Sequence, residues 1–149
     1  AMQHMRVDLG GGRIVEQKWK FYCDTSNWPD FMPRPGFSEF SGPVDEVGTT
    51  YVQSMKLMGF EMSQNVEIVE IEPLRLIHEH SDSWSMDNYF RFEPDGDATK
   101  VVFESDWEMS GKLPGFIKDL ANKGWMERNT RHILADFKAL AEARVPAHV

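Results

Sequence analysis

The C-terminal part of this chain, residues 114–143, constrains the fold most, because its pattern is that of one long amphipathic helix. Pro114 suits the first helical turn, where the N–H that proline lacks would have no partner. Farther on, Ile133, Phe137 and Leu140 recur at spacings of three and four residues. At about 1.5 Å per residue this helix would be roughly 45 Å long, too long for a small domain to surround. The helix must therefore lie along a broad surface.

The rest of the chain can supply that surface, because most of it has the pattern of β-strands. We predict strands over residues 5–9, 37–41, 49–57, 60–71, 75–81, 88–93 and 99–109, and two short helices over 13–22 and 28–31. The apolar positions change phase between Ile68 and Val69, which predicts a β-bulge. Tight turns join successive strands, so neighbouring strands should be antiparallel. This order predicts an α+β fold, with one sheet wrapped around one long helix.

Composition and charge exclude several classes of partner. The 149 residues suit one domain, which we place at residues 5–145, and residues 1–4 have the look of a cloning remnant. A net charge of −8 without any basic run argues against nucleic acid or an anionic membrane surface as partner. No apolar stretch approaches the roughly 20 residues that span a bilayer. The single Cys23 excludes an internal disulfide and fits the reducing cytoplasm. Both a monomer and a homodimer agree with the sequence.

Aromatic and methionine side chains share strand faces in a way that indicates a ligand cavity. In the last strand, Phe103, Trp107 and Met109 share one face, whereas the other face is nearly all acidic. Many such residues only fill a core, but one helix rarely fills a curved sheet completely. We therefore predict a cavity between sheet and helix, with Trp84, Met86 and Trp125 near its entrance. The predicted ligand-binding residues are Met58, Phe60, Met62, His78, His80, Trp84, Tyr89, Phe103, Trp107, Met109, Phe116, Leu120 and Trp125.

The most concentrated polar cluster is His78-Glu79-His80 with Asp82. In a strand, residues 78, 80 and 82 share one face, so two imidazoles and a carboxylate could approach a metal ion. No spacing fixes a further ligand, and structural metal sites generally need four. The same residues could line the cavity or lie in solvent. We expect no bound metal.

Signals for catalysis are weak. Glu104, Asp106 and Glu108 would act as acids or bases only in a dry pocket, and their place opposite an apolar face favours solvent. The glycines at 10–12 lack the ending of a phosphate-binding loop, and no nucleophile elbow occurs. We expect no cofactor, and whether the protein is an enzyme stays open.

Four segments carry a resemblance to a known family. The first is the helix that leads into Asp24, followed by Asn27-Trp28-Pro29. The second is Gly48-Thr49 at the start of a strand, and the third is Glu70-Ile71-Glu72-Pro73 at the end of one. The fourth is Tyr89-Phe90-Arg91-Phe92-Glu93-Pro94 with Gly96 and Thr99, followed by the last strand and the Leu134–Ala143 helix. Together they resemble the START-like, or SRPBCC, superfamily of helix-grip proteins over nearly the whole chain. That superfamily includes lipid- and steroid-transfer domains, plant pollen-allergen-like carriers and bacterial polyketide cyclases. The glycines at 10–12 replace the family's short apolar-proline element.

The resemblance implies a helix-grip fold, with a curved antiparallel sheet of about seven strands around a long C-terminal helix. It also implies a deep, mostly apolar cavity between them. We therefore expect binding or transport of a hydrophobic small molecule such as a lipid, sterol, quinone or polyketide. One alternative is an enzyme of the polyketide cyclase or dehydratase kind, in which His78, His80 or Tyr89 moves protons. The other is a ligand-free protein-interaction module that uses the acidic strand face.

Overall fold

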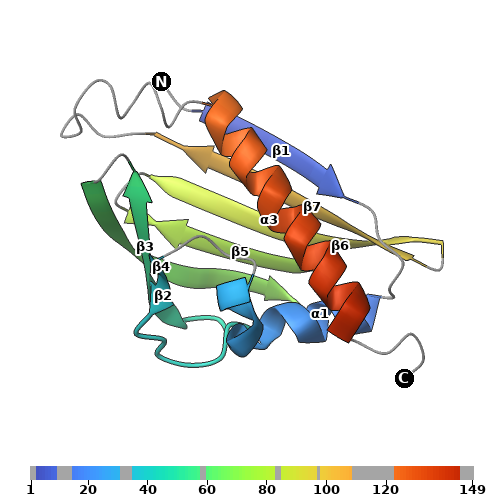
Figure 1. The fold of residues 1–149 in the computed structure, drawn as a ribbon. Coiled ribbons are helices and arrows are strands. Elements are labelled where there is room, and N and C mark those ends of the chain that lie inside the picture. The colour runs from blue at the N-terminus through green and yellow to red at the C-terminus, as the bar shows by residue number, and fades with distance from the viewer. Residues whose placement is uncertain are drawn as a thin grey trace.

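The computed structural model describes residues 3–9, 15–30, 35–57, 60–82, 85–96, 98–108 and 123–144. Within these ranges the elements are β1 (Gln3–Leu9), α1 (Val15–Cys23), the 3₁₀ helix η1 (Thr25–Asp30), β2 (Pro35–Ser38), β3 (Thr50–Leu57), β4 (Phe60–Glu72), β5 (Leu76–Ser81), β6 (Met86–Asp95), β7 (Ala98–Trp107) and α3 (Lys123–Arg144) (Figure 1). This order confirms the predicted α+β, helix-grip architecture. The first strand begins two residues earlier than expected, inside the segment for which no structure was predicted.

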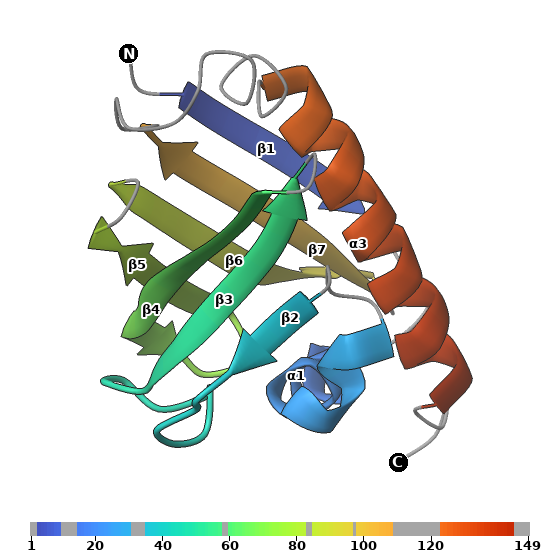
Figure 2. The same cartoon turned by 60° about the vertical axis from the view of Figure 1, so that its left-hand side comes forward.

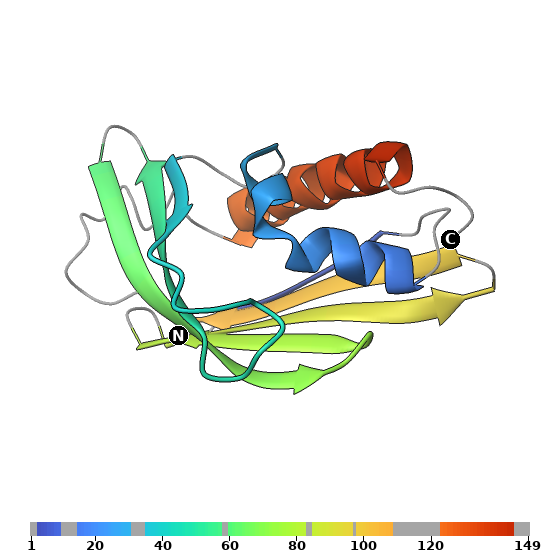
Figure 3. The same cartoon turned by 90° about the horizontal axis from the view of Figure 1, so that it is seen from below.

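The seven strands form one antiparallel sheet in the order β1-β7-β6-β5-β4-β3-β2. From β2 to β7 each strand pairs with its neighbour in sequence, as short connections favour. β1 pairs instead with β7, so the first and last strands lie side by side. The sheet curves, and α1 and α3 both lie on its concave side (Figures 2 and 3). We call the face toward the helices the inner face and the opposite one the outer face.

The predicted bulge in β4 is present. Ile68 of β4 pairs with Glu79 of β5, and the next pair is Glu70 with His78. Val69 is therefore left without a partner, and its side chain is exposed. A bulge bends its strand and increases the local twist, so this extra residue helps the sheet to curve around the helices.

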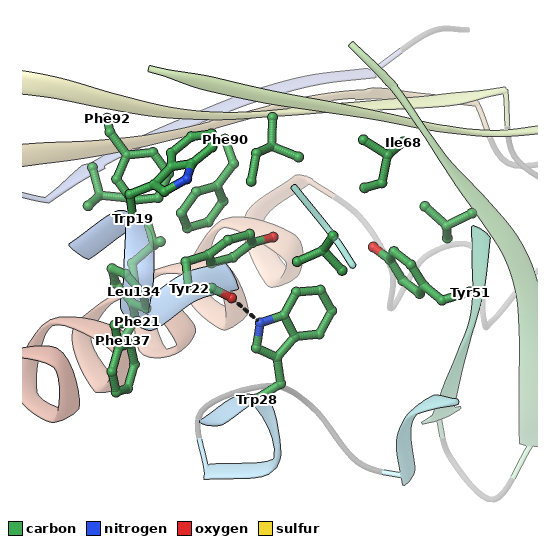
Figure 4. Close-up of a cluster of buried hydrophobic side chains, with 14 of the residues drawn as sticks. Trp19, Phe21, Tyr22, Trp28, Tyr51, Ile68, Phe90, Phe92, Leu134 and Phe137 are labelled. Atoms are coloured by element: carbon green, nitrogen blue, oxygen red, sulfur yellow. Dashed lines mark hydrogen bonds between the residues drawn. The ribbon is translucent and has the colours of Figure 1, made fainter. Parts of the chain in front are cut away.

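Aromatic side chains join the helices to the inner face (Figure 4). Tyr22 of α1 stacks on Phe90 of β6, with ring centroids 4.3 Å apart. Phe137 of α3 meets Phe21 edge-on at 5.5 Å and Phe90 at 6.0 Å. The buried Trp28 Nε1 donates a hydrogen bond of 2.7 Å to the carbonyl oxygen of Tyr22. The indole therefore keeps a polar partner inside an otherwise apolar cluster.

Helix α1 is also fixed at its polar side. Lys18 is fully buried, and its Nζ donates a hydrogen bond of 3.1 Å to the carbonyl oxygen of Thr99 at the start of β7. The next residue, Trp19, meets Phe92 of β6 edge-on at 5.3 Å. These contacts hold α1 against β6 and β7, which leaves the inner faces of β3 to β5 to other neighbours.

Helix α3 has 22 residues and a length of about 33 Å. It packs against β1 and contacts α1. Leu134 and Phe137 are buried, and Ile133 and Leu140 are partly buried against the same core, as the spacing predicted. The first part of the predicted helix, residues 114–122, lies outside the described residues. No helix in the described ranges is both long enough and apolar enough to cross a membrane.

Phe137→Ala should destabilise the protein strongly, because Phe137 is 1 % exposed and contacts aromatic rings of both α1 and β6. Truncating a buried phenylalanine costs about 3–5 kcal/mol, and each kcal/mol lowers the melting temperature by roughly 2–4 °C at this size. Thermal unfolding followed by circular dichroism measures the shift. Arg131→Ala on the exposed side of α3 is the control and should change the melting temperature little. Equal shifts in the two variants would contradict the described packing of α3.

Candidate ligand-binding site

Strand β5 carries different polar groups on its two faces, because side chains alternate along a strand. Ile77 and Ser81 are buried on the inner face, and Glu79 between them points the same way. His78 and His80 point to the outer face, where both contact Asp87 of β6. An acidic side chain therefore lies on the face that otherwise forms the core.

A row of hydrogen bonds crosses the inner face and ends at Glu79. Tyr51 of β3 donates its hydroxyl proton to Glu79 Oε2. Asn88 Nδ2 of β6 donates to Glu79 Oε1 at 3.4 Å. Ser105 of β7 in turn donates to Asn88 Oδ1 at 2.6 Å. The carboxylate of Glu79 therefore accepts from Tyr51 and Asn88, and Ser105 holds the Asn88 side chain in turn.

The surroundings of Glu79 disfavour its charge. Burial raises the pKa of the Glu79 carboxyl, and the hydrogen bonds from Tyr51 and Asn88, with the nearby charge of His78, offset only part of that effect. In the described part of the chain, no lysine or arginine forms an ion pair with Glu79. The residue as a whole is nevertheless only partly buried. Glu79 therefore holds a carboxyl group deep on the inner face without being wholly removed from solvent.

Two tyrosines flank this carboxyl group. Burial, followed by the charge of Glu79, raises the pKa of both Tyr22 and Tyr51 well above the ordinary value of 10.0. Both phenols therefore stay protonated at neutral pH. Figure 4 shows their hydroxyl ends turned toward one another from α1 and β3. A carboxyl and two phenol groups thus converge from three elements, an arrangement that can bind a polar group or exchange a proton with it.

The inner face has two further polar groups near the turn that joins β5 to β6. Gln64 of β4 donates to Gln53 Oε1 at 2.9 Å, and its Nε2 lies 3.9 Å from Met86 Sδ. Met86 is the cross-strand partner of Ser81. Among the described residues, the buried Gln64 Oε1 and Ser81 Oγ have no hydrogen-bond partner. Leaving a buried polar group unpaired costs about 1–3 kcal/mol, so a polar group that entered here would be stabilised.

The inner face contains two of the predicted site residues with described side chains. Phe103 is partly buried, lies 6.0 Å from Phe90 and belongs to the margin of the aromatic core. Trp107 is only 1 % exposed and lies inside that core. Of the two, Phe103 is the one with surface left to contact a ligand.

Three predicted residues lie on the other face. His78 stacks on Tyr89 with ring centroids 4.2 Å apart, and His80 Nδ1 lies 3.0 Å from Asp87 Oδ1. The expectation that His78, His80 and Tyr89 line the space beneath the helix is corrected here. The strand phase turns these side chains outward, and the same phase turns Glu79 inward.

The other predicted site residues cannot be placed. Met58, Trp84, Met109, Phe116 and Leu120 lie outside the described residues, and of Phe60, Met62 and Trp125 only the backbone is described. Their contribution to a cavity stays a prediction.

The outer histidines form hydrogen bonds with acids of the sheet and its turn. His78 Nε2 lies 2.9 Å from Asp87 Oδ1, and His80 Nε2 lies 2.8 Å from Asp82 Oδ1. Hydrogen bonding to Asp82, and then to Asp87, raises the pKa of His80. Within the described ranges, no group of three or more His, Cys, Asp or Glu side chains has a geometry that could hold a metal ion. The cluster is a hydrogen-bonded array on the outer surface.

The acidic side chains on the outer face of β7 have basic neighbours. Glu104 lies 3.1 Å from Arg91 and 3.3 Å from Arg6, and Asp106 lies 2.6 Å from His4. These acids point away from the helices, in agreement with the predicted solvent-facing position. The two arginines beside Glu104 leave less free negative charge for a binding partner than the sequence implied.

Cys23 does not provide a reactive thiol. Burial, with a smaller effect from the charge of Asp45, raises the pKa of its thiol to about 12. The thiolate, which is the nucleophilic form, is therefore scarce at neutral pH.

Sequence reasoning missed the central polar residues of the site: Tyr51, Gln64, Glu79, Ser81 and Asn88. One available signal was the phase of β5, in which Glu79 shares its parity with Ile77 rather than with the histidines. The other partners come from β3, β4 and β6, and only the pairing register brings them together.

Comparisons with known proteins identify the fold. No protein-family model matches the chain, and a search of curated proteins finds no significant match. Solved structures do match. The ZhuI aromatase/cyclase from Streptomyces sp. R1128 is 18% identical with a TM-score of 0.74, covering 99% of this chain and 98% of that one. The protein TTHA0849 from Thermus thermophilus is 17% identical with a TM-score of 0.73, covering 95% and 98%.

A plant protein has the same fold. The major latex-like protein 151 from Panax ginseng is 15% identical with a TM-score of 0.69, and the match covers 93% of this chain and 96% of that one. These matches confirm the predicted helix-grip fold. At such low identity they assign the fold and leave the function to the site itself.

Glu79→Gln should stabilise the protein at neutral pH. A carboxyl whose pKa is raised on folding contributes its stability below the unfolded pKa, and that contribution is lost as the pH rises through the folded value. Above that value the buried charge opposes folding, and glutamine removes it. The difference in melting temperature between the variant and the wild type should be positive at pH 7 and smaller near pH 4. A variant that is less stable than the wild type at pH 7 would show that Glu79 is not an internal carboxyl of this kind.

Proposed function

We propose that this protein binds a hydrophobic small molecule on the inner face of its sheet, with the Glu79 row fixing the orientation of the ligand. The observation that carries this proposal is a buried carboxyl group, with no basic partner among the described residues, inside an aromatic interior. A purely structural core gains nothing from such a group, because burying a carboxylate is unfavourable unless it is well paired. Ligand sites, in contrast, combine apolar walls with a few polar groups that give orientation.

The aromatic residues around this row support the same proposal. Phe90 is buried beside Tyr22, while Phe103 of the neighbouring strand stays partly accessible. Apolar ligand surface placed against such rings contributes about 25 cal/mol for each Å² removed from water. Apolar contact would then supply most of the affinity, and Glu79 would select the orientation.

A neutral solvatochromic dye such as Nile red should bind to one saturable site with a blue shift in its emission. Phe103→Ala should weaken this binding, because the ring belongs to the partly accessible margin of the inner face. Tyr89→Ala is the matched control: Tyr89 is also an aromatic residue with partial exposure, but it lies on the outer face. Fluorescence titration of the folded variants gives the dissociation constants.

The opposite result would contradict the proposal. If Tyr89→Ala loses dye binding while Phe103→Ala keeps it, the ligand lies on the outer face. If folded wild-type protein shows no saturable binding, the hydrophobic-ligand function fails.

A second candidate function is proton transfer at a carbonyl substrate, favoured by the contact between Glu79 and Tyr51. A carboxyl with a raised pKa is suited to general acid–base catalysis near neutral pH. One of the solved structures with this fold is an aromatase/cyclase. In this reading Glu79 takes a proton from the carbon next to a carbonyl group, and a tyrosine hydroxyl stabilises the enolate oxygen until the carbon is reprotonated.

Deuterium exchange into the methyl group of 2-acetylnaphthalene, followed by NMR in D₂O, tests this second function. Wild-type protein should accelerate the exchange over buffer, and Glu79→Gln should abolish the acceleration. Glu67→Gln, an exposed acid on β4, should keep it. Binding without acceleration would favour a carrier over an enzyme.

A further inference from the structure

The hydrogen bonds to Glu79 leave some of its acceptor sites unfilled, and a hydrogen-bond donor could fill them. A carboxylate has about four acceptor sites, and the described residues fill two of them, through Tyr51 on Oε2 and Asn88 on Oε1. The Asn88 contact is long, at 3.4 Å. Because the residue is only partly buried, an incoming group would meet the acceptor sites that remain.

Gln64 of β4 also provides a hydrogen-bond acceptor on the inner face. Gln64 Oε1 is a buried acceptor without a partner among the described residues, while the amide nitrogen of the same side chain is already bonded to Gln53. Besides the Ser81 hydroxyl, which can donate or accept, the described inner face therefore offers two groups with acceptor sites left over, the Glu79 carboxyl and Gln64 Oε1. A hydrogen-bond donor complements both.

The described inner face offers an anionic ligand no basic partner near Glu79. In the described structure the basic groups paired with sheet acids, Arg6, Arg91 and Lys100, lie on the outer face with those acids. Lys18 donates to the carbonyl of Thr99, at the far end of β7 from Ser105. A carboxylate that entered beside Glu79 would place two like charges close together in a poorly solvated interior, where their repulsion is strong.

We propose that the inner site selects hydrophobic ring compounds that carry a neutral hydroxyl donor and rejects those that carry a carboxylate. This inference rests on the proposed function and adds to it the chemical class of the ligand. The hydroxyl would donate to a remaining acceptor site of Glu79 while the rings lie against the aromatic margin at Phe103. A fatty acid or another anionic amphiphile would then be a poor ligand.

Three probes with one ring system isolate this choice: naphthalene, 2-naphthol and 2-naphthoate. Their binding at pH 7 is measured by displacement of Nile red from the 149-residue protein. Wild-type protein should bind 2-naphthol about tenfold more tightly than naphthalene, as a hydrogen bond to a charged acceptor provides. It should bind 2-naphthoate more weakly than naphthalene.

Substitution of Glu79 should move the two polar probes in opposite directions. Glu79→Gln keeps an acceptor but removes the charge, so the preference for 2-naphthol should shrink while 2-naphthoate binds more tightly than to the wild type. Glu79→Met, of similar volume and apolar, should abolish the preference for 2-naphthol. Glu67→Gln carries the same change of charge on an exposed outer residue and should leave both ratios as in the wild type.

The outcomes separate this inference from the function on which it rests. Equal affinity for the three probes, or a preference for 2-naphthoate, overturns the inference and leaves the binding of a hydrophobic molecule standing. Failure of 2-naphthol to displace Nile red from protein that binds the dye also overturns it. If neither the dye nor any probe binds to folded protein, the proposed function and the inference fall together.

Discussion

The packing of two helices against only one face of the sheet is the constraint on which the rest of the structure depends. Phe137 of α3 and Tyr22 of α1 both meet Phe90 of β6, so one ring on the inner face holds both helices (Figure 4). Because strand side chains alternate, this contact makes every second residue of the neighbouring strands an interior residue. The outer face carries charged pairs such as Glu104 with Arg91.

Against that background Glu79 is the residue that departs from the pattern. Its position requires a carboxyl group to lie among apolar neighbours, and the hydrogen bonds from Tyr51 and Asn88 offset only part of the effect of burial on its pKa. Natural proteins tolerate such locally unfavourable groups mainly where function depends on them. The same reasoning gives the outer histidines less weight. They are close to solvent, and each has a carboxylate neighbour that accounts for its presence.

The long helix and the row at Glu79 lie over different parts of the sheet. Helix α3 packs on β1, at the edge of the sheet, whereas the row runs from β3 to β7 across its middle. The two meet at β6, which carries Phe90 against the helices and Asn88 in the row.

The amino-acid sequence by itself determined the element order, the antiparallel sheet, the bulge after Ile68 and the core-facing positions of Ile133 and Phe137, because these depend on periodicity and on short connections. Only the tertiary structure decided which residues share the site. The phase of β5 relative to the helices turned Glu79 inward and His78 outward, and one step of register reverses such an assignment. Tyr51, a hydrogen-bond partner of Glu79, lies 28 residues away in the sequence. No local sequence pattern indicates that two such distant residues will meet. Local periodicity reports which residues face the same way, whereas the packing of the helices decides which of the two faces becomes the interior.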